Sequence, residues 1–331
     1  MTEAASAPSA LVVGVGAVGA RAARQLLSNG FRVLVTDERA DREHTVLDAL
    51  GEPATRYPGD PTTADADLVV LAHGPEPHEP LAAALVRRGI PVVSVADDPD
   101  DVRALLDLDA EARERGCVVA VGAGFSPGFS CVLAAHAASL LDVVTEVHVA
   151  RAGTGGPACA VRHHDALSGV ALDWRDGGWV RRSAGSGREL CWFPDPIGGR
   201  DCYRASLPEP LLLVRAFPSA DRITARLAAN RRDRLTARLP MLRPPHADGG
   251  PGATRVEVRG ERLGEGTATV VYGAMEVPSM AAGAVAAAAA GLVVAGATRR
   301  NGAGGLAELF DPLLLLQSLA ERGVKAAAFT G

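Results

Sequence analysis

Three glycines near the start of the chain carry the clearest chemical signal, in the run Gly14-Val15-Gly16-Ala17-Val18-Gly19. The run matches the pattern G-x-G-x-x-G and stands between an apolar stretch typical of a buried strand and a helical pattern. There Gly14 permits a tight turn, Gly16 lets the backbone approach a pyrophosphate, and Gly19 lets the helix pack closely on the strand. The N–H groups of Ala17 and Val18, at the start of that helix, can then bind phosphate. The run predicts a dinucleotide site, with a simple strand-to-helix turn as the alternative.

Asp37 and Arg39 bear on which dinucleotide is bound. Asp37 ends the second apolar run, 18 residues after Gly19. A carboxylate there accepts hydrogen bonds from the adenosine ribose hydroxyls and repels a 2′-phosphate, which favours NAD over NADP. Arg39 can instead hold a 2′-phosphate, so NADP stays possible. An ordinary turn residue is the alternative reading of Asp37.

Ala72, His73 and Gly74 follow a later apolar run at the same expected sheet edge. Small residues there would let the cofactor pass close to the backbone, and we assign all three to the cofactor site. His73 could face the nicotinamide, and a merely solvated histidine is the alternative.

Asp97, His163 and Tyr272 are the candidates for acid–base chemistry. Asp97 directly follows the apolar run 91–96, whereas its neighbour Asp98 is better explained as the cap of the next helix. His163 stands in His163-His164-Asp165, which could supply a general acid or base with its orienting carboxylate. We place this run on a strand, where only one of the two histidines can face a given site. Tyr272 closes the last expected strand, and a surface position is the alternative for the histidine.

Arg200, Tyr203 and Arg204, in a proline-rich segment, could hold a substrate carboxylate by bidentate contact. Lysine and arginine total 34, yet the only lysine is Lys325, so an ordinary surface arginine is the alternative. Glu321 rather than tyrosine stands four residues before Lys325, which excludes a Tyr-x-x-x-Lys dehydrogenase centre.

The composition is that of a globular protein: 331 residues, 47% hydrophobic and 22% charged. A net charge of −5 offers no basic field to nucleic acid or to a membrane surface. The five cysteines form no Cys-x-x-Cys pair, which suits reduced cytoplasmic thiols and predicts no metal site. The start of the chain lacks a signal-peptide pattern, and the uncharged stretch 277–298 is rich in Ala and Gly, as in a tightly packed helix. We expect a cytoplasmic protein with a small-molecule substrate.

Residues 11–124 alternate between apolar runs and helical patterns, which predicts βαβ units in a doubly wound parallel sheet. The expected strands are 11–15, 31–36, 68–72, 91–96 and 118–122, and the expected helices are 17–28, 81–88 and 99–115. After residue 141 a period-2 alternation predicts antiparallel strands with one solvated face. These strands are 144–151, 169–174, 179–182, 255–259 and 267–272, with a flexible loop at 242–252 and a helix-rich tail at 278–323.

Several segments together indicate a family. The glycine run begins VVGVGAVGARAARQL, and DLVVLAHGP and GIPVVSVADD follow in order. The most specific piece is VVAVGAGFSPGFSCVLAAHAA, and FPDPIGGRDCYRASLPEP is an aromatic, proline-rich segment. In these segments the chain resembles the saccharopine dehydrogenase-like family of NAD(P)-dependent oxidoreductases. The resemblance is weakest over residues 153–190 and 222–265. The resemblance implies an N-terminal Rossmann domain, a mixed α/β substrate domain that commonly mediates dimerisation, and oxidoreduction at a carbon–nitrogen bond.

Ser126 departs from the family pattern, because related enzymes commonly carry Asp before the Pro-Gly pair of this turn. Serine is also a good helix N-cap and Pro127 suits a first helical turn, so the fold should tolerate the exchange. A carboxylate for a substrate ammonium group is lost, unless a neighbour such as Asp97 replaces it. We therefore treat Ser126 as a substrate-site residue and expect a substrate other than saccharopine.

These observations predict an α/β protein with a Rossmann doubly wound parallel sheet and a second, mixed α/β domain whose sheet is largely antiparallel. The function expected is hydride transfer between NAD, or possible NADP, and a C–N bond of an amine, imine or amino-acid-derived substrate. Alternatives are an alcohol or ketone oxidoreductase and a nucleotide-binding sensor or scaffold without turnover. We also expect a homodimer formed through the sheet of residues 142–274. The predicted divisions are 1–125 for the cofactor, 126–274 for substrate and dimerisation, and 275–331 packing back on the first domain.

Overall fold

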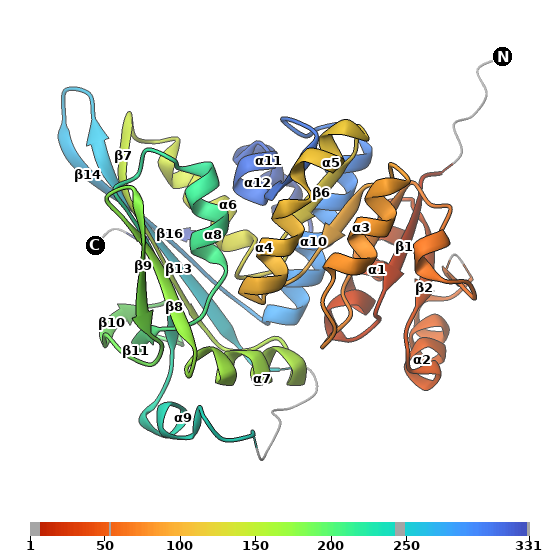
Figure 1. Ribbon diagram of the computed structural model, residues 1–331, viewed down its shortest axis with the longest axis horizontal. Helices are drawn as coiled ribbons and strands as arrows, with labels where there is room; N and C mark the ends of the chain where they lie inside the picture. Colours follow the sequence, from red (N-terminus) through yellow and green to blue (C-terminus); the bar gives the residue numbers. More distant parts are fainter. Residues whose placement is uncertain (1–6, 53, 242–248, 330–331) are drawn as a thin grey trace.

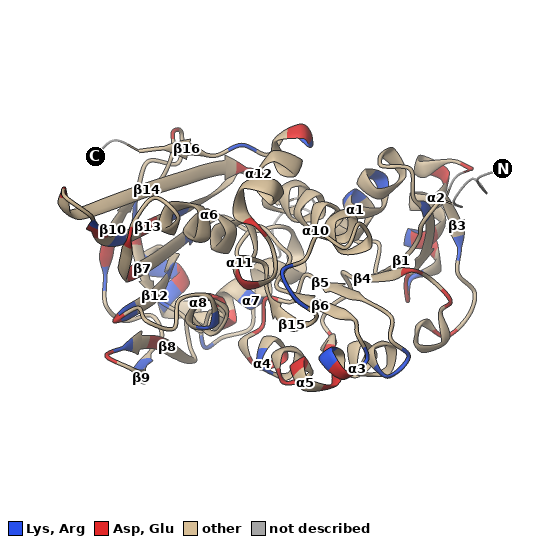
Figure 2. Ribbon diagram, turned by 90° about the horizontal axis from the view of Figure 1, so that it is seen from above, with Lys and Arg blue, Asp and Glu red and all other residues tan. Residues whose placement is uncertain are grey.

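The computed structural model describes residues 7–52, 54–241 and 249–329. Two β-sheets lie side by side, with helices between them and around the first (Figures 1 and 2). The predicted α/β class, with one parallel and one largely antiparallel sheet, is confirmed.

The first sheet is entirely parallel and follows the order β15-β6-β5-β4-β1-β2-β3. Its central strands are fully buried, because helices cover both faces of the sheet (Figure 2). The strands are β1 (Ser9–Val13), β2 (Arg32–Thr36), β3 (Ala54–Arg56), β4 (Leu68–Leu71), β5 (Val92–Ser94), β6 (Val118–Val121) and β15 (Gly302–Gly305).

Helices α1 and α10 lie on one face of this sheet, and α3, α4 and α5 lie on the other (Figure 2). The expected helix 99–115 is two helices, and the sequence analysis missed α2 and β3. The helices are α1 (Ala17–Ser28), α2 (Ala40–Leu50), α3 (Glu79–Arg87), α4 (Pro99–Asp107), α5 (Asp109–Glu114), α10 (Pro278–Val294), α11 (Leu306–Leu309) and α12 (Pro312–Glu321), with a 3₁₀ turn at Pro61–Thr63.

The Ala- and Gly-rich stretch forms the buried helix α10, as expected. It packs so closely on α1 that a Cβ added at Gly283 would lie 2.6 Å from Arg21 Cβ. Small residues thus let two helices approach where larger side chains would hold them apart. Within the described ranges, none of the helices combines the length and apolarity needed to cross a bilayer.

Over the described residues the second sheet has nine strands, in the order β10-β11-β12-β7-β13-β14-β16, with β8 paired to β12 and β9 paired to β8. The β12–β7 pair is parallel and the other pairs are antiparallel. The strands are β7 (Val143–Ala152), β8 (Val170–Arg175), β9 (Gly178–Ser183), β10 (Glu189–Trp192), β11 (Gly199–Arg204), β12 (Arg222–Ala228), β13 (Gly252–Arg262), β14 (Gly266–Glu276) and β16 (Ala327–Ala328). Strands β10, β11 and β12 were not anticipated, and residues 242–248 of the expected loop lie outside the described residues.

Four helices accompany this sheet: α6 (Phe129–Ala138), α7 (Pro157–Ala166), α8 (Glu209–Ala216) and α9 (Arg231–Thr236). Helices α6 and α8 lie between the two sheets (Figures 1 and 2). Helix α6 begins at Phe129 with Gly128 as its N-cap, so the expectation that Ser126 caps it was wrong. Gly128 takes that place because its φ of +119° suits glycine alone.

The chain returns to the first sheet after β14. Helix α10 packs on α1, and β15 adds to the edge of the parallel sheet beside β6. The last short strand, β16, pairs with β14 and so belongs to the second sheet. The two parts of the molecule are therefore joined by several crossings of the chain, and a cavity lies where they meet.

Candidate active site

A cavity of about 990 Å³ opens at the carboxyl ends of β1, β4 and β5, opposite helix α7. This is the edge at which open α/β sheets bind their ligands. One end, which we call the cofactor end, is formed by residues 14–18, Asp37 and Arg42. The other, the inner end, is formed by Asp97, Arg151, Cys159, Arg162 and His163.

The glycine turn at the cofactor end has the geometry that its motif predicts. Gly14 has φ of +84°, and a Cβ there would lie 2.4 Å from His73 Cα. A Cβ at Gly19 would lie 1.8 Å from the carbonyl oxygen of Gly14. Gly16 is different, because the nearest atom to its Cβ position is Arg42 Nη1 at 3.8 Å. The protein itself leaves room at Gly16, as a site for a closely approaching ligand requires.

The start of α1 can receive an anion. Gly16 is its N-cap, and in the described part of the chain no side chain caps the helix and no acidic residue lies in its first turn. Ala17 and Val18 line the cavity at this point. A helix N-terminus of this kind offers its N–H groups and the positive end of its dipole to a phosphate.

Asp37 closes the cofactor end beside the turn. Its Oδ2 accepts a hydrogen bond of 2.8 Å from the Val15 N–H, and its Oδ1 accepts one of 2.9 Å from the Arg39 N–H. Arg39 pairs with Asp41 at the surface, whereas Arg42 places Nη1 3.6 Å from Asp37 Oδ2 and lines the cavity. Arg39 lines the cavity as well, so two arginines flank Asp37, and the sequence analysis did not name Arg42.

Ala72, His73 and Gly74 line the cavity after β4, as predicted. Behind them, His78 hydrogen-bonds Ser94 Oγ through Nδ1 at 2.8 Å and the His73 carbonyl oxygen through Nε2 at 2.9 Å. Burial, reinforced by the nearby His73 ring, lowers the pKa of His78 to about 3. His78 is therefore a neutral residue that supports the loop, while burial also lowers the pKa of His73.

At the inner end, Asp97 and Arg162 bridge the two parts of the molecule. Arg162 Nη1 lies 3.0 Å from Asp97 Oδ1, and Arg162 Nη2 lies 3.0 Å from the position of a Cβ on Gly74. The guanidinium thus reaches from α7 to the loops that follow β4 and β5. Burial raises the pKa of Asp97, and Arg162 opposes that shift. Asp98 caps α4 by accepting from the Asp100 and Asp101 N–H groups, as predicted.

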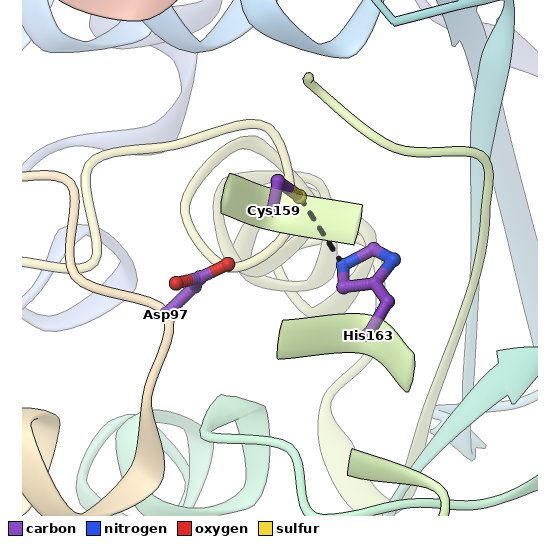
Figure 3. Close-up of side chains that lie close together, drawn as sticks. All are labelled: Asp97, Cys159 and His163. Carbon is purple, nitrogen blue, oxygen red and sulfur yellow. Dashed lines mark hydrogen bonds between the residues drawn. The ribbon is translucent and has the colours of Figure 1, made fainter. Parts of the chain in front are cut away.

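Cys159 and His163 project from α7 toward Asp97 (Figure 3). Cys159 Sγ lies 3.5 Å from His163 Nε2, and one ligand atom from each of the three residues falls within 4.8 Å of the others. The expected strand at these histidines was wrong, because residues 157–166 form a helix that places residues four apart on one face. His164 points elsewhere and hydrogen-bonds the Leu239 carbonyl oxygen at 2.9 Å.

The protonation states at this end follow from burial and from two arginines. Burial, with the positive charges of Arg151 and Arg162, holds the pKa of His163 well below its usual range, so the imidazole is neutral at pH 7. Burial and the Asp97 carboxylate raise the pKa of the Cys159 thiol to about 11. Without a further partner, this cysteine is a thiol rather than a thiolate.

Ser126 lines the cavity, and a carboxylate stands behind it. Its Oγ donates a hydrogen bond of 2.8 Å to Glu209 Oε1, and Glu209 pairs with Arg151 across 3.5 Å. The Arg151 guanidinium also donates to the Ser126 carbonyl oxygen. Glu209 is completely buried, so it supports Ser126 and Arg151 from outside the cavity. The sequence analysis did not foresee this carboxylate.

Besides Gly19, which packs against the Gly14 carbonyl oxygen, four predicted site residues are not among the described residues that line the cavity. Arg200, Tyr203 and Arg204 lie on β11, where Arg204 pairs with Asp173 and the Tyr203 ring packs under Arg234 at 4.1 Å. Tyr272 lies on β14 with its ring 5.4 Å from that of His136. These substrate-binding and catalytic assignments therefore need correction, because the proline-rich segment continues into a sheet strand.

The residues that the sequence analysis missed are Arg151, Cys159 and Arg162 at the inner end and Glu209 behind it. The sequence did contain one signal for two of the five side chains at the inner end. Cys159 and His163 are four residues apart, the spacing of two ligands on one face of a helix. Reading α7 as a strand concealed that spacing.

Comparisons with known proteins agree with this architecture. A family model described as NAD(P)-binding matches residues 5–105. The fold is similar to that of apo saccharopine dehydrogenase (L-Glu forming) from Saccharomyces cerevisiae, with a TM-score of 0.70 and 14% identity over 98% of this chain and 100% of that chain. The fold expected from the sequence resemblance is thereby confirmed. The chain thus has the fold of this dehydrogenase, with an NAD(P)-binding family match over residues 5–105.

Two further similarities are weaker or partial. GenD2 from gentamicin A biosynthesis, solved in complex with NAD, has a TM-score of 0.49 and 17% identity over 100% of this chain and 98% of that chain. UDP-N-acetylmuramoylalanine–D-glutamate ligase from Syntrophus aciditrophicus (strain SB) is 39% identical over 90 residues, which span 25% of this chain and 20% of the ligase.

Proposed function

We propose that this protein is an NAD(P)-dependent oxidoreductase that transfers hydride at a C–N bond of an amine, imine or amino-acid-derived small molecule. The main support for this proposal is that one cavity joins the glycine turn to the charged inner end. A nicotinamide ring extending from the turn would meet a partly enclosed site with charged side chains at its inner end. The nicotinamide would perform the hydride transfer, and the protein would supply orientation and a path for the proton.

The inner end has groups suited to a nitrogen-containing substrate. The Asp97 carboxylate can accept a hydrogen bond from an ammonium or iminium group, and Arg162 can bind a substrate carboxylate by its guanidinium fork. The fold similarity to saccharopine dehydrogenase supports the same bond type. We propose a substrate other than saccharopine, because Ser126 is neutral and the neighbouring Glu209 is fully buried.

For the cofactor we propose NAD, with NADP as the alternative. Asp37 faces the cavity beside the glycine turn and would accept from the ribose hydroxyls. Arg39 also lines the cavity, and its exposed pair with Asp41 leaves it able to serve a 2′-phosphate. Arg42 could likewise serve NADP, but its neighbour Asp37 offsets its charge.

An alcohol or ketone oxidoreductase is the second candidate, and one observation favours it. Asp97, Cys159 and His163 converge on a point in the cavity where a substrate oxygen could be bound. A sensor or scaffold without turnover is less well supported, because such a protein needs no charged, partly enclosed site beside the nicotinamide.

We propose that the protein acts as a homodimer formed through the second sheet. Helices α6 and α8 cover the face that looks toward the first sheet (Figure 1). Trp179 on β9 and Leu190 and Trp192 on β10 are 44%, 58% and 64% exposed. β10 is an edge strand, and exposed aromatic and aliphatic side chains at a sheet edge favour association. Light scattering should give twice the 34.0 kDa chain mass at micromolar concentration, and the chain mass itself would contradict the dimer.

The test of the function is a screen for NADH oxidation with pooled imines, ketones and amino-acid-derived oxo acids. Activity with an imine pool, lost on Asp97→Asn while NADH binding is kept, is the expected result. Activity confined to ketones or aldehydes would select the second candidate. NADH binding without turnover in every pool, with either reduced or oxidised cofactor, would support the sensor instead.

A further inference from the structure

Three side chains at the inner end carry donor atoms that metal ions bind. Asp97 contributes a carboxylate oxygen, Cys159 a sulfur and His163 an imidazole nitrogen, all within 4.8 Å of one another (Figure 3). Asp97 comes from the loop after β5, whereas the other two come from α7. Elements from both parts of the molecule therefore meet at one point.

The distance between the two α7 donors fits a small tetrahedral ion. Cys159 Sγ and His163 Nε2 are 3.5 Å apart. Zn²⁺ binds sulfur at about 2.3 Å and imidazole nitrogen at about 2.0–2.1 Å, so a tetrahedral angle separates such ligands by about 3.6 Å. Asp97 would become the third ligand if its loop moved slightly toward Cys159 and His163.

The contacts behind the donors resemble those that orient metal ligands. The His163 ring already directs its Nε2 toward Cys159. Arg162 binds Asp97 at Oδ1, and a carboxylate held at one oxygen can ligate through the other. Ligating histidines and carboxylates commonly have such partners, which fix the ring or the carboxylate in place.

The positive charges of two nearby arginines would repel a metal cation unless carboxylates neutralise them. Arg151 is paired with the buried Glu209. Arg162 is paired with Asp97, which would share its carboxylate between the guanidinium and the ion. A thiolate at Cys159 and the Asp97 carboxylate supply two negative charges against the three positive charges of the ion and Arg162, so the loaded site carries one net positive charge, which suits an anionic group at the open position.

We propose that Asp97, Cys159 and His163 bind one Zn²⁺ ion, with a fourth position open to the cavity. Thiolate, imidazole and carboxylate together suit zinc better than magnesium or calcium, which prefer oxygen alone. Three protein ligands and one open position are typical of zinc sites that act on a substrate. The ion would bind a carbonyl or alcohol oxygen there, a consequence that rests on the proposed oxidoreductase function and favours its alcohol or ketone form. The metal site itself does not depend on it.

The test is metal binding by the full chain, purified without metal and then loaded with Zn²⁺. We expect one Zn²⁺ per chain to remain after gel filtration. Co²⁺ in its place should give the intense visible bands of a tetrahedral ion and a near-ultraviolet thiolate-to-cobalt band. Cys159→Ser should remove that thiolate band, and Cys159→Ser, His163→Asn and Asp97→Asn should each weaken Zn²⁺ binding at least about 100-fold.

Two matched controls are available: one residue lies next to a proposed ligand, and the other has the same side chain as a proposed ligand. His164 is the next residue on α7 but hydrogen-bonds Leu239, and Cys117 is a buried cysteine outside the cavity lining. His164→Asn and Cys117→Ser should keep the zinc content and the cobalt spectrum. Circular dichroism of each variant identifies any that fails to fold, and alkylation of Cys159, slowed by Zn²⁺ in the unmodified chain, gives a readout without substitution.

No stoichiometric Zn²⁺, a cobalt spectrum without the thiolate band, or equal zinc content in Cys159→Ser would overturn the proposal. Titration with NADH separates this failure from that of the proposed function. Zinc binding without NADH binding would keep the metal site and remove the oxidoreductase. NADH binding without zinc binding would remove the metal site and leave the proposed oxidoreductase function standing.

Discussion

The cofactor end of the cavity is built from backbone, whereas the inner end is built from side chains. At the first, Gly14, Gly16 and Gly19 shape a turn within six consecutive residues, and the first N–H groups of α1 face the cavity with no side-chain cap among the described residues. At the second, Asp97 comes from the loop after β5, whereas Arg151 and His163 come from β7 and α7, much later in the sequence. A local backbone site depends on single residues that nothing can replace. A site assembled from distant side chains depends on partners that hold each other in place.

Two of the buried histidines, His78 and His163, show the same contrast. His78, behind the cofactor end, has both ring nitrogens hydrogen-bonded to protein. His163, at the inner end, directs Nε2 to a cysteine in the wall of the cavity. A histidine whose nitrogens are both used by the fold supports structure, and one that faces a cavity beside a thiol is available for chemistry.

The largest effect should come from the glycine turn, where two glycines separate folding from binding. Gly19→Val would place a side chain on the Gly14 carbonyl oxygen, a backbone atom that cannot move out of the way. We therefore expect this variant to lose its cooperative thermal unfolding. Gly16→Val meets only the flexible end of Arg42 and should change the melting temperature little. Circular dichroism melting of both variants measures this, and equal stability of the two would refute the distinction.

The next effect concerns the buried pair that supports the inner end. Glu209→Gln keeps an acceptor for Ser126 but leaves the Arg151 charge without its partner, which should cost about 3–5 kcal/mol in the free energy of unfolding. Asp100→Asn, which breaks the exposed pair with Arg103, is the matched control and should leave stability unchanged. Urea denaturation compares them. A Glu209→Gln variant as stable as the control would show that the pair is not needed.

Acid should destabilise the protein through His78. Its pKa is lowered to about 3 by burial, while that of an unfolded histidine is about 6.5. The unfolded chain therefore binds a proton that the folded chain refuses, and stability falls as the pH drops from about 6 toward 3. The contribution is at most about 1.4 kcal/mol per pH unit. Unfolding free energies between pH 6 and pH 4 should depend less steeply on pH in His78→Gln, and an unchanged slope would be evidence against this role.

The smallest effect should be on cofactor choice. Asp37→Ser removes the charge that repels a 2′-phosphate and releases Arg42 to bind one. The ratio of NADH to NADPH affinity should fall by at least about tenfold, as expected for loss of a charge-assisted hydrogen bond. Calorimetric titration of both cofactors measures the ratio. Tighter NADPH binding by the unmodified protein would reverse the proposed preference.

The sequence predicted the cofactor end well because its determinants are local. The glycine spacing, Asp37 and the apolar runs lie within short windows, and the structure places them as expected. It predicted the inner end poorly, because only Asp97 and His163 of its five side chains were named. Cys159 and Arg162 reach the cavity only because α7 is a helix, and Gly156-Pro157 at its start was the signal for one.

Other errors have similar causes. Tyr203 and Arg204 stand in a proline-rich segment that reads as a loop, yet pairing with β12 makes it the strand β11. Glu209 could not be connected to Ser126 from sequence, since 83 positions separate them. Contacts of this kind arise from tertiary packing and leave no local pattern.

The most direct test of the central claim, that one cavity joins a cofactor turn to a separate reactive end, is the titration of NADH into three forms of the full chain. The unmodified protein should bind one NADH per chain, and Gly16→Val should bind it at least about 100-fold more weakly, or by ~2.7 kcal/mol, while melting at the same temperature. Asp97→Asn should bind NADH as the unmodified protein does. Undiminished binding by Gly16→Val, or no binding of NADH or NADPH by the unmodified protein, would contradict the account.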